Sequence, residues 1–205
     1  ASIAFSGGST PKLLFAALAE QAIDWPAVQV TLVDERCVPP DHERSNARLL
    51  REFLLSKLPV QPVFLPLFEP GESSSERNAR LQALAWPMDV AVLGMGGDGH
   101  TASFFPGARN LDALLDPQQP EKIMDTRSVP DDEPRVTWSL AALLEAQHLI
   151  LHICGEDKAR VLQTALEQLE SGSAKAPYPI ASLLQHTSQL NANDVPLDIY
   201  FSKNS

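Results

Sequence analysis

The sequence predicts an α/β fold: a single doubly wound, three-layer α/β/α sandwich built on a mostly parallel sheet. Short apolar runs rich in β-branched residues recur along the chain, as is typical of strands that are buried on both faces. Segments in which apolar residues have helical spacing separate these runs, which favours βα units. The chain has 205 residues, of which 44% are apolar, and no repeat or linker divides it, so we expect one domain over residues 1–205.

The first βα unit is expected over residues 2–21. Residues 2–5 form the strand, and residues 12–21 form an amphipathic helix with Pro11 at its first position and Thr10 at its N-cap. The glycines before Thr10 would expose amides at the positive end of the helix, where phosphate binds readily. An ordinary capped turn would have the same sequence, so both interpretations stay open.

A second apolar strand, residues 28–33, ends in a cluster of charged residues that begins at Asp34. This cluster is either a solvated loop or an anion site, in which Arg36 offers a planar fork of donors and the neighbouring acids orient it. Ser45 and Asn46 follow, and their short polar side chains are expected to cap the next helix.

The segment after that helix alternates between loops and one further helix. Residues 59–70 contain four prolines, which limits them to a short edge strand and loops. Residues 72–85 are predicted to be a polar helix, because Leu81 and Leu84 continue at helical spacing after a serine-rich start.

The most informative stretch is the apolar strand of residues 90–93 and the turn that follows it. Four glycines within six residues, at positions 94, 96, 97 and 99, permit a tight turn and a close approach of the backbone to a ligand. Asp98 and His100 are carried on this turn. Ligands bind at the carboxyl ends of the strands in an open α/β sheet, so the sequence predicts the active site here.

The same turn also matches the G-x-G-x-x-G pattern of dinucleotide-binding proteins. Asp98 would then lie where a pyrophosphate needs only backbone amides and a positive helix end. In addition, no second strand ends in an acidic residue about twenty residues later, as the dinucleotide site requires. We therefore disfavour a dinucleotide site.

The next part of the chain has weaker patterns. Residues 110–116 are expected to form a short helical segment, and residues 131–134 an exposed acidic loop. Residues 135–137 are expected to open a helix that continues over residues 140–146.

A further apolar strand, residues 149–154, leads through Gly155 into another helix. Lys158 lies in the first turn of that helix, where a cation is disfavoured unless an anion is nearby, although a solvated surface lysine is the simpler alternative. The remaining segments are expected to be a loop at residues 172–179, a short helix at residues 180–184 and a final strand at residues 197–201.

Composition narrows the class of protein. The formal charge of −10 and the pI near 4.9 argue against nucleic acid or an anionic membrane as a partner, since both need a basic face. Cys37 and Cys154 adjoin apolar runs and lack a second ligand at metal-site spacing, which favours buried reduced thiols. No apolar run approaches membrane-spanning length, so we expect a cytoplasmic protein. The chain opens directly on a strand, and we expect that a natural N-terminal helix is missing from this sequence.

Five motifs together resemble the 6-phosphogluconolactonase family, hydrolases of the oxidative pentose phosphate pathway. They are SGGSTP at residues 6–11, DERCVPPDHERSN at 34–46, LGMGGDGHTASFFP at 93–106, RVTWS at 135–139 and GEDKA at 155–159. The resemblance implies a fold similar to glucosamine-6-phosphate deaminase and ribose-5-phosphate isomerase. It also implies a sugar-phosphate lactone as the substrate, 6-phosphogluconate as the product and no cofactor. A monomer is favoured.

The resemblance further implies catalytic roles. His100 is the general base that activates water for attack on the lactone carbonyl, so neither a covalent nucleophile nor a metal is expected. Asp34 is expected to orient water or substrate, and Asp98 to orient the turn or the imidazole. The amides of Gly96 and Gly97 are expected to meet the charge that develops on the carbonyl oxygen.

For the phosphate of the substrate, the resemblance points to Ser9 and Thr10 at the helix start. It also points to three cations, Arg36, Arg135 and Lys158, which explains the lysine in a helical first turn. Three cations within a chain of charge −10 would form a local electropositive centre that steers a dianion.

Two rival functions remain. Glucosamine-6-phosphate deaminase shares the phosphate turn and the Asp-Gly-His motif, but it carries an asparagine, a glutamate and a proline where this chain has Phe104-Phe105-Pro106. The loss of that acid disfavours deaminase chemistry. A non-catalytic sugar-phosphate sensor on the same fold is the other alternative, and the intact His100, Arg135 and Lys158 weigh against it.

Overall fold

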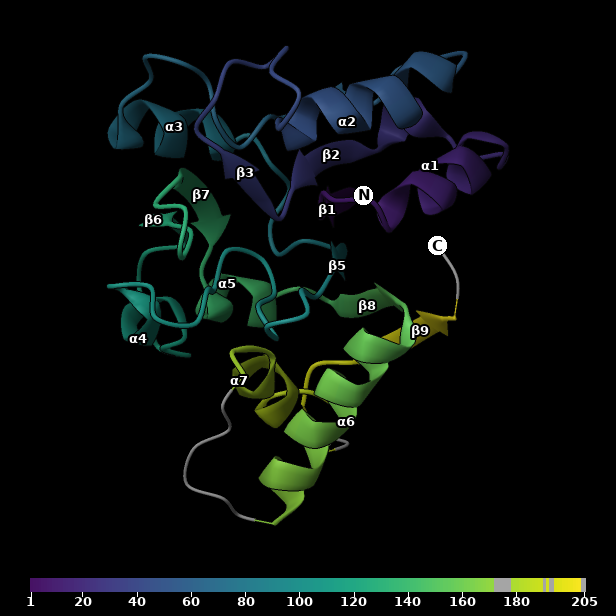
Figure 1. The fold of residues 1–205 in the computed structure, drawn as a ribbon. Helices are drawn as coiled ribbons and strands as arrows, with labels where there is room; N and C mark the ends of the chain where they lie inside the picture. The colour runs from purple at the N-terminus through teal and green to yellow at the C-terminus, as the bar shows by residue number, and fades with distance from the viewer. Residues whose placement is uncertain (172–177, 190, 192–193, 204–205) are drawn as a thin grey trace.

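The main sheet of the protein has six strands, all parallel, in the order β4-β2-β1-β5-β8-β9 (Figure 1). The structure is a computed structural model that describes residues 1–171, 178–189, 191 and 194–203. The strands are β1 (Ser2–Phe5), β2 (Gln29–Leu32), β4 (Val63–Phe64), β5 (Val90–Leu93), β8 (His148–Cys154) and β9 (Leu197–Ser202). The prediction of a mostly parallel sheet is confirmed, and β4 is the short edge strand expected among the prolines.

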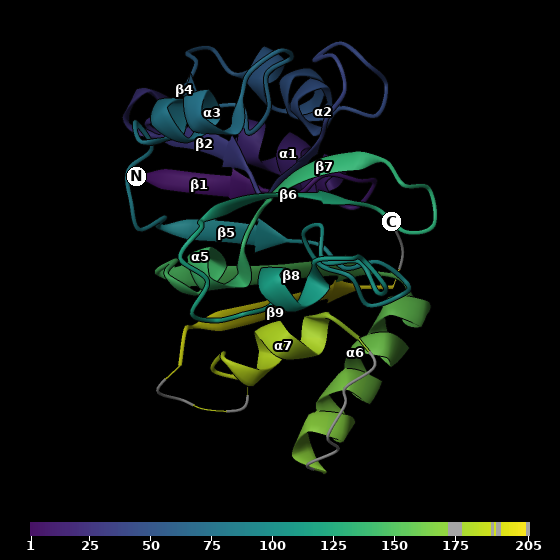
Figure 2. The same cartoon turned by 90° about the vertical axis from the view of Figure 1, so that its left-hand side faces the viewer.

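Helices flank this sheet. They are α1 (Pro11–Ala19), α2 (Asn46–Phe53), α3 (Ser74–Leu81), α4 (Leu111–Leu114), α5 (Leu140–Leu144), α6 (Glu156–Glu170) and α7 (Ile180–Gln185), with the 3₁₀ turns η1 (Trp25–Ala27) and η2 (Leu55–Lys57). Figures 1 and 2 show α1, α2 and α3 at the end of the molecule that holds β1, β2 and β4, whereas α6 and α7 lie at the end that holds β8 and β9. The loop predicted at residues 172–179 falls largely outside the described residues.

Local signals placed several helix starts correctly. Ser45 caps α2 by accepting a hydrogen bond from the amide of Arg48. Ser73 and Glu76 form a capping box at α3, so this helix begins near the predicted start but ends at Leu81, before the predicted end at residue 85. No helix among the described residues is long and apolar enough to cross a membrane.

A second, antiparallel sheet was not expected. It contains β3 (Asp34–Arg36), β7 (Pro134–Trp138) and β6 (Ile123–Arg127), in the order β3-β7-β6. The prediction that residues 135–137 open a helix is wrong, because Val136 and its neighbours suit a strand and Ser139 is the residue that caps α5. Residues 34–36, for which a solvated loop and an anion site were both open, form a strand that pairs with β7, so the solvated loop is excluded.

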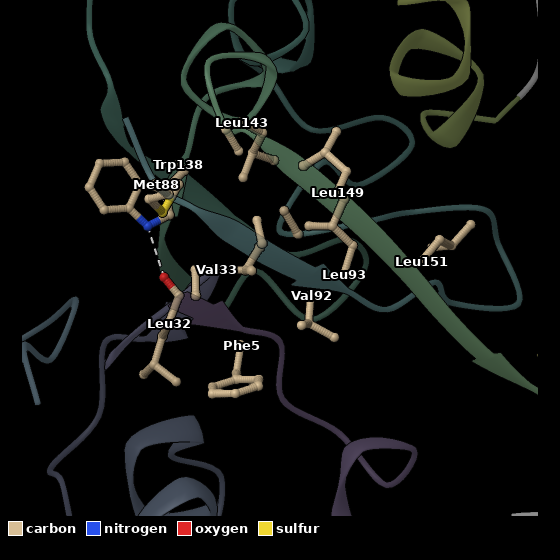
Figure 3. Close-up of a cluster of buried hydrophobic side chains, with 14 of the residues drawn as sticks. Phe5, Leu32, Val33, Met88, Val92, Leu93, Trp138, Leu143, Leu149 and Leu151 are labelled. Atoms are coloured by element: carbon tan, nitrogen blue, oxygen red, sulfur yellow. Dashed lines mark hydrogen bonds between the residues drawn. The ribbon is translucent and has the colours of Figure 1, made fainter. Parts of the chain in front are cut away.

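The core joins the two sheets. Trp138 of β7 is almost completely buried, and its indole Nε1 donates a hydrogen bond of 2.8 Å to the carbonyl of Leu32 at the end of β2. Each large side chain buried here contributes about 1.5–3 kcal/mol to folding. Figure 3 shows the surrounding side chains, which include Phe5, Val33, Met88, Val92, Leu93, Leu143, Leu149 and Leu151.

The two cysteines are free thiols, but both are half-buried and not fully buried as predicted. Burial, together with the negative charge of Asp125, raises the pKa of Cys37 to about 11. A thiol with so high a pKa stays protonated at neutral pH and is a poor nucleophile or metal ligand.

Candidate active site

The carboxyl ends of β1, β5 and β8 surround a cleft with a volume of about 220 Å³. This is the edge of the sheet where an open α/β fold binds ligands. All but two of the site residues predicted from the sequence line it: Ser9, Thr10, Asp34, Arg36, Gly96, His100, Arg135 and Lys158. The exceptions, Gly97 and Asp98, lie on the same turn as His100 but do not line the cleft.

The turn between β1 and α1 presents backbone amides to the cleft. Within the described residues, the amides of Gly7, Gly8, Ser9 and Thr10 donate no hydrogen bond. Thr10 is at the N-cap and Pro11 at the first helical position, as predicted, but Thr10 has helical backbone angles and its hydroxyl makes no capping hydrogen bond. These unpaired donors can therefore bind an anion at the helix start.

Gly7 is required for this turn to pack against the start of α2. A Cβ at position 7 would lie 1.8 Å from Oδ1 of Asn46, which is far shorter than any nonbonded contact between heavy atoms. Nδ2 of Asn46 in turn donates to the carbonyl of Asp34 at 2.9 Å. The turn between β1 and α1, the start of α2 and β3 are thus held in direct contact beside the cleft.

Two arginines meet on neighbouring strands. Arg36 of β3 and Arg135 of β7 are partners in register, and both line the cleft. Nε of each is buried and has no hydrogen-bond partner among the described residues. Burial, and secondly the positive charge of Arg36, lowers the pKa of Arg135. An anion in the cleft would supply the missing acceptors and offset the repulsion between the two cations.

Arg135 is also held by acids. Its Nη2 lies 2.9 Å from Oε2 of Glu133, and its Nη1 lies 3.8 Å from Oδ2 of Asp34. Asp34 is buried, and Oδ2 accepts a hydrogen bond of 2.6 Å from the hydroxyl of Ser103. Within the part of the chain that the structure describes, Asp34 therefore lies beside the arginines and makes no hydrogen bond or ion pair with His100.

His100 is oriented by Asp98. Nδ1 of the imidazole lies 2.5 Å from Oδ1 of Asp98, and the ring stacks at 4.5 Å on Phe105. Burial would raise the pKa of Asp98, but the hydrogen bond and charge of His100 outweigh it and lower the pKa, which keeps the group a carboxylate. A carboxylate at Nδ1 selects the tautomer with its proton on Nδ1, so Nε2 carries the lone pair that accepts a proton.

Gly96 and Gly97, whose amides were predicted to meet the charge on the carbonyl oxygen, lie in different surroundings. The amide of Gly96 donates to the carbonyl of His100 at 2.9 Å, and Gly97 is exposed outside the cleft. The Gly96 amide is thus engaged within its own turn, and the oxyanion role of Gly96 and Gly97 stays a prediction. A Cβ on Gly96 would lie 2.3 Å from the ring of His100, so the glycine is needed because it leaves room for the imidazole.

Two residues near this cleft were not predicted from the sequence. His152 of β8 lines it, and burial, together with the positive charge of Lys158, lowers the pKa of His152. The sequence could have indicated His152, because it lies near the carboxyl end of a predicted parallel strand. Glu133, predicted to be part of an exposed acidic loop, instead contacts Arg135. Within the described part of the chain, no group of three or more His, Cys, Asp and Glu residues is arranged to hold a metal ion.

Known proteins resemble this chain over nearly all its length. The family model described as glucosamine-6-phosphate isomerases/6-phosphogluconolactonase matches residues 1–192. A 6-phosphogluconolactonase of Rhizobium meliloti is 42% identical over 206 residues, which cover 98% of this chain and 84% of that protein. One from Xylella fastidiosa is 40% identical over 190 residues, covering 90% of this chain and 77% of the relative.

Solved structures agree with these sequence comparisons. The crystal structure of a 6-phosphogluconolactonase from Shewanella baltica has a TM-score of 0.87 and 34% identity, covering 98% of this chain and 83% of that one. A monomeric glucosamine-6-phosphate deaminase has a TM-score of 0.75 at 15% identity, covering 99% of this chain and 86% of that one. The latter likeness concerns the fold alone.

Proposed function

The chain belongs to the family of glucosamine-6-phosphate isomerases and 6-phosphogluconolactonases, and on that premise we propose that it hydrolyses 6-phospho-D-glucono-1,5-lactone to 6-phosphogluconate. The observation that carries the proposal is His100, held by Asp98 through Nδ1, in the same cleft as three cations. This activity belongs to the oxidative pentose phosphate pathway, and a cytoplasmic location is proposed with it.

The substrate phosphate is expected to bind between the start of α1 and the cations. The unpaired amides of residues 7–10 supply donors without charge, while Arg36, Arg135 and Lys158 supply charge-assisted hydrogen bonds. With the phosphate bound there, the lactone ring is expected to extend toward His100, which lines the same cleft on the turn after β5.

Hydrolysis then needs one proton transfer in each direction. Nε2 of His100 takes a proton from water as the water oxygen attacks the lactone carbonyl carbon, and the carbonyl oxygen becomes an oxyanion. When the tetrahedral intermediate collapses, the bond to the ring oxygen breaks and the imidazolium returns the proton to that oxygen. The carboxylate of Asp98 stabilises the imidazolium in between, and its 2.5 Å contact holds the ring in place.

Deaminase chemistry is disfavoured by the residues that follow the shared motif. Phe104 is fully buried and Phe105 is nearly so, with its ring against both His100 and Arg135. Both side chains are buried, and Phe105 packs behind His100 without lining the cleft. They supply no acid where the deaminase pattern has a glutamate.

The test is hydrolysis of freshly prepared 6-phosphogluconolactone, followed against the spontaneous reaction in the same buffer. We expect the purified protein to accelerate the reaction and His100→Asn to lose most of the acceleration. Glucosamine-6-phosphate serves as the second substrate. A protein that left the lactone at its spontaneous rate would contradict the proposal, and release of ammonia from glucosamine-6-phosphate would favour the deaminase instead.

A further inference from the structure

Glu133 lies at the centre of a cluster of three arginines next to the cleft. Its Oε2 contacts Nη2 of Arg135 and Nη2 of Arg44, both at 2.9 Å. Arg36 joins the same cluster, because its Nη1 donates to the carbonyl of Arg44. One carboxylate oxygen thus connects β7 with the loop after β3, and through it the two arginines that line the cleft.

The position of Arg135 depends on this contact. Its side chain is only 8% exposed, so it cannot leave the site, and its guanidinium has two acidic neighbours. Glu133 is in hydrogen-bond contact with Nη2, whereas Asp34 is 3.8 Å from Nη1, beyond hydrogen-bond reach. Because the two acids lie on different sides of the guanidinium, Glu133 keeps it from closing onto Asp34.

We propose that Glu133 is a positioning residue that holds Arg135 away from Asp34 and so keeps this arginine available for the substrate phosphate. The proposal rests on the proposed function, since it concerns how the same cleft captures a phosphorylated lactone. Without the charge of Glu133, Arg135 pairs with Asp34 in a short ion pair, and its guanidinium loses the carboxylate that lies nearest to it.

A purely electrostatic role predicts the opposite result. A carboxylate near an anion site repels the anion, so its removal would strengthen phosphate binding if the arginines kept their places. The sign of the effect therefore separates positioning from simple repulsion. Positioning predicts weaker binding of phosphate, and repulsion predicts tighter binding.

The experiment compares Glu133→Gln with Asp132→Asn. Asp132 is the preceding residue, and it makes an ion pair of similar length, 2.8 Å, with the exposed Arg127 and not with Arg135. Asp132 has a φ of 53°, which asparagine also tolerates, so the control introduces no backbone strain. Glu133→Asp, which keeps the charge on a shorter side chain, tests for partial rescue.

The readout is the ratio of kcat/KM for 6-phosphogluconolactone to kcat/KM for unphosphorylated glucono-1,5-lactone. We expect Glu133→Gln to lower this ratio about tenfold, mainly through KM for the phosphorylated substrate, since one charge-assisted contact is lost. Asp132→Asn should leave it within about twofold, as is usual for an exposed ion pair. Calorimetric titration with inorganic phosphate gives a second measure that needs no turnover.

The outcomes separate the two proposals. A ratio and a phosphate affinity unchanged in Glu133→Gln, or a tighter affinity, would overturn the positioning role while the lactonase function stands. If the wild type hydrolyses neither lactone, the proposed function fails, and the phosphate titrations still decide the role of Glu133. Equal losses in Asp132→Asn would also overturn it, because they would reflect the loop and not Arg135.

Discussion

At the scale of single residues, the contact between Asp98 and His100 determines which imidazole nitrogen can accept a proton. His100→Asn keeps a polar side chain of similar reach but has no titratable nitrogen. We expect kcat to fall on the order of 10²–10⁴-fold, with the affinity for 6-phosphogluconate and the thermal midpoint near wild type. Steady-state rates, product titration and thermal unfolding check this. A folded, product-binding variant with more than about a tenth of the wild-type rate would show that another group is the base.

The cations make a separate residue-scale prediction. Lys158→Ala and Arg135→Ala each remove a charge-assisted hydrogen bond to phosphate, and each should cost roughly 1.5–3 kcal/mol in kcat/KM, mostly through KM. Glucono-1,5-lactone, which has no phosphate, is the control substrate. Losses of the same size on both lactones would mean that these residues do not bind the phosphate.

His152 gives a pH dependence of stability. Burial, with the charge of Lys158, lowers the pKa of His152 below its ordinary value of 6.5, so the folded state binds fewer protons than the unfolded state. The stability that the neutral His152 allows is therefore fully present above pH 6.5, and it is lost as the pH falls from 6.5 through the lowered pKa of the folded state.

We therefore expect His152→Gln to lose less stability than the wild type when the pH is lowered through this range. Urea unfolding on either side of pH 6.5 measures it. His148→Gln is the control, since His148 lies on the same strand but pairs with Asp198 outside the cleft. Parallel curves for wild type and His152→Gln would contradict the assignment.

At the scale of elements, the junction of β3 and α2 depends on the buried carboxylate of Glu35. It accepts hydrogen bonds from the amides of Arg36, Asn46 and Ala47 and from the hydroxyl of Ser45. Burial raises the pKa of Glu35, while these donors act in the opposite direction. The contacts fix the start of α2 against β3. They also fix the position of Asn46 beside Gly7, in the turn between β1 and α1.

Glu35→Gln replaces one acceptor oxygen by an NH₂ group, which is itself a donor and cannot accept the hydrogen bonds that this oxygen receives. We expect a loss of about 1–3 kcal/mol in the free energy of unfolding, measured by urea denaturation, because a buried donor is left unpaired. Glu52→Gln on α2 is the control, because the exposed carboxylate of Glu52 is 4.0 Å from Arg48. It should change the free energy of unfolding by less than about 0.5 kcal/mol. Equal stabilities of Glu35→Gln and wild type would refute the junction role.

At the scale of the whole molecule, a cleft with three cations lies within a chain of formal charge −10. Attraction of a phosphorylated substrate into this centre is screened by salt, and the Debye length falls from about 10 Å at 0.1 M to about 3 Å at 1 M. We expect KM for 6-phosphogluconolactone to rise severalfold over that range while KM for glucono-1,5-lactone changes little. Initial rates in a salt series test this. A matching rise for both lactones would show that salt acts on the protein and not on phosphate capture.

The sequence by itself determined the parallel sheet and the turns that bear the site. Strands β1, β5 and β8 are mainly apolar runs, and glycines together with polar residues follow each of them within a few positions. These signals are local, because burial on both faces and tight turning each demand particular residues at neighbouring positions. The amino-acid sequence was therefore sufficient to place His100 and Lys158 at the carboxyl ends of strands.

Only the tertiary structure decided how the charged residues meet. Strand β3 is short and polar, and it pairs with β7, a segment about a hundred residues away, so no local periodicity reveals it. That pairing sets Arg36 opposite Arg135 and brings Glu133 between arginines. The hydrogen bond from the Gly96 amide to the carbonyl of His100 could likewise not be predicted from the sequence. The partner of a backbone amide depends on the path of the backbone and not on residue type.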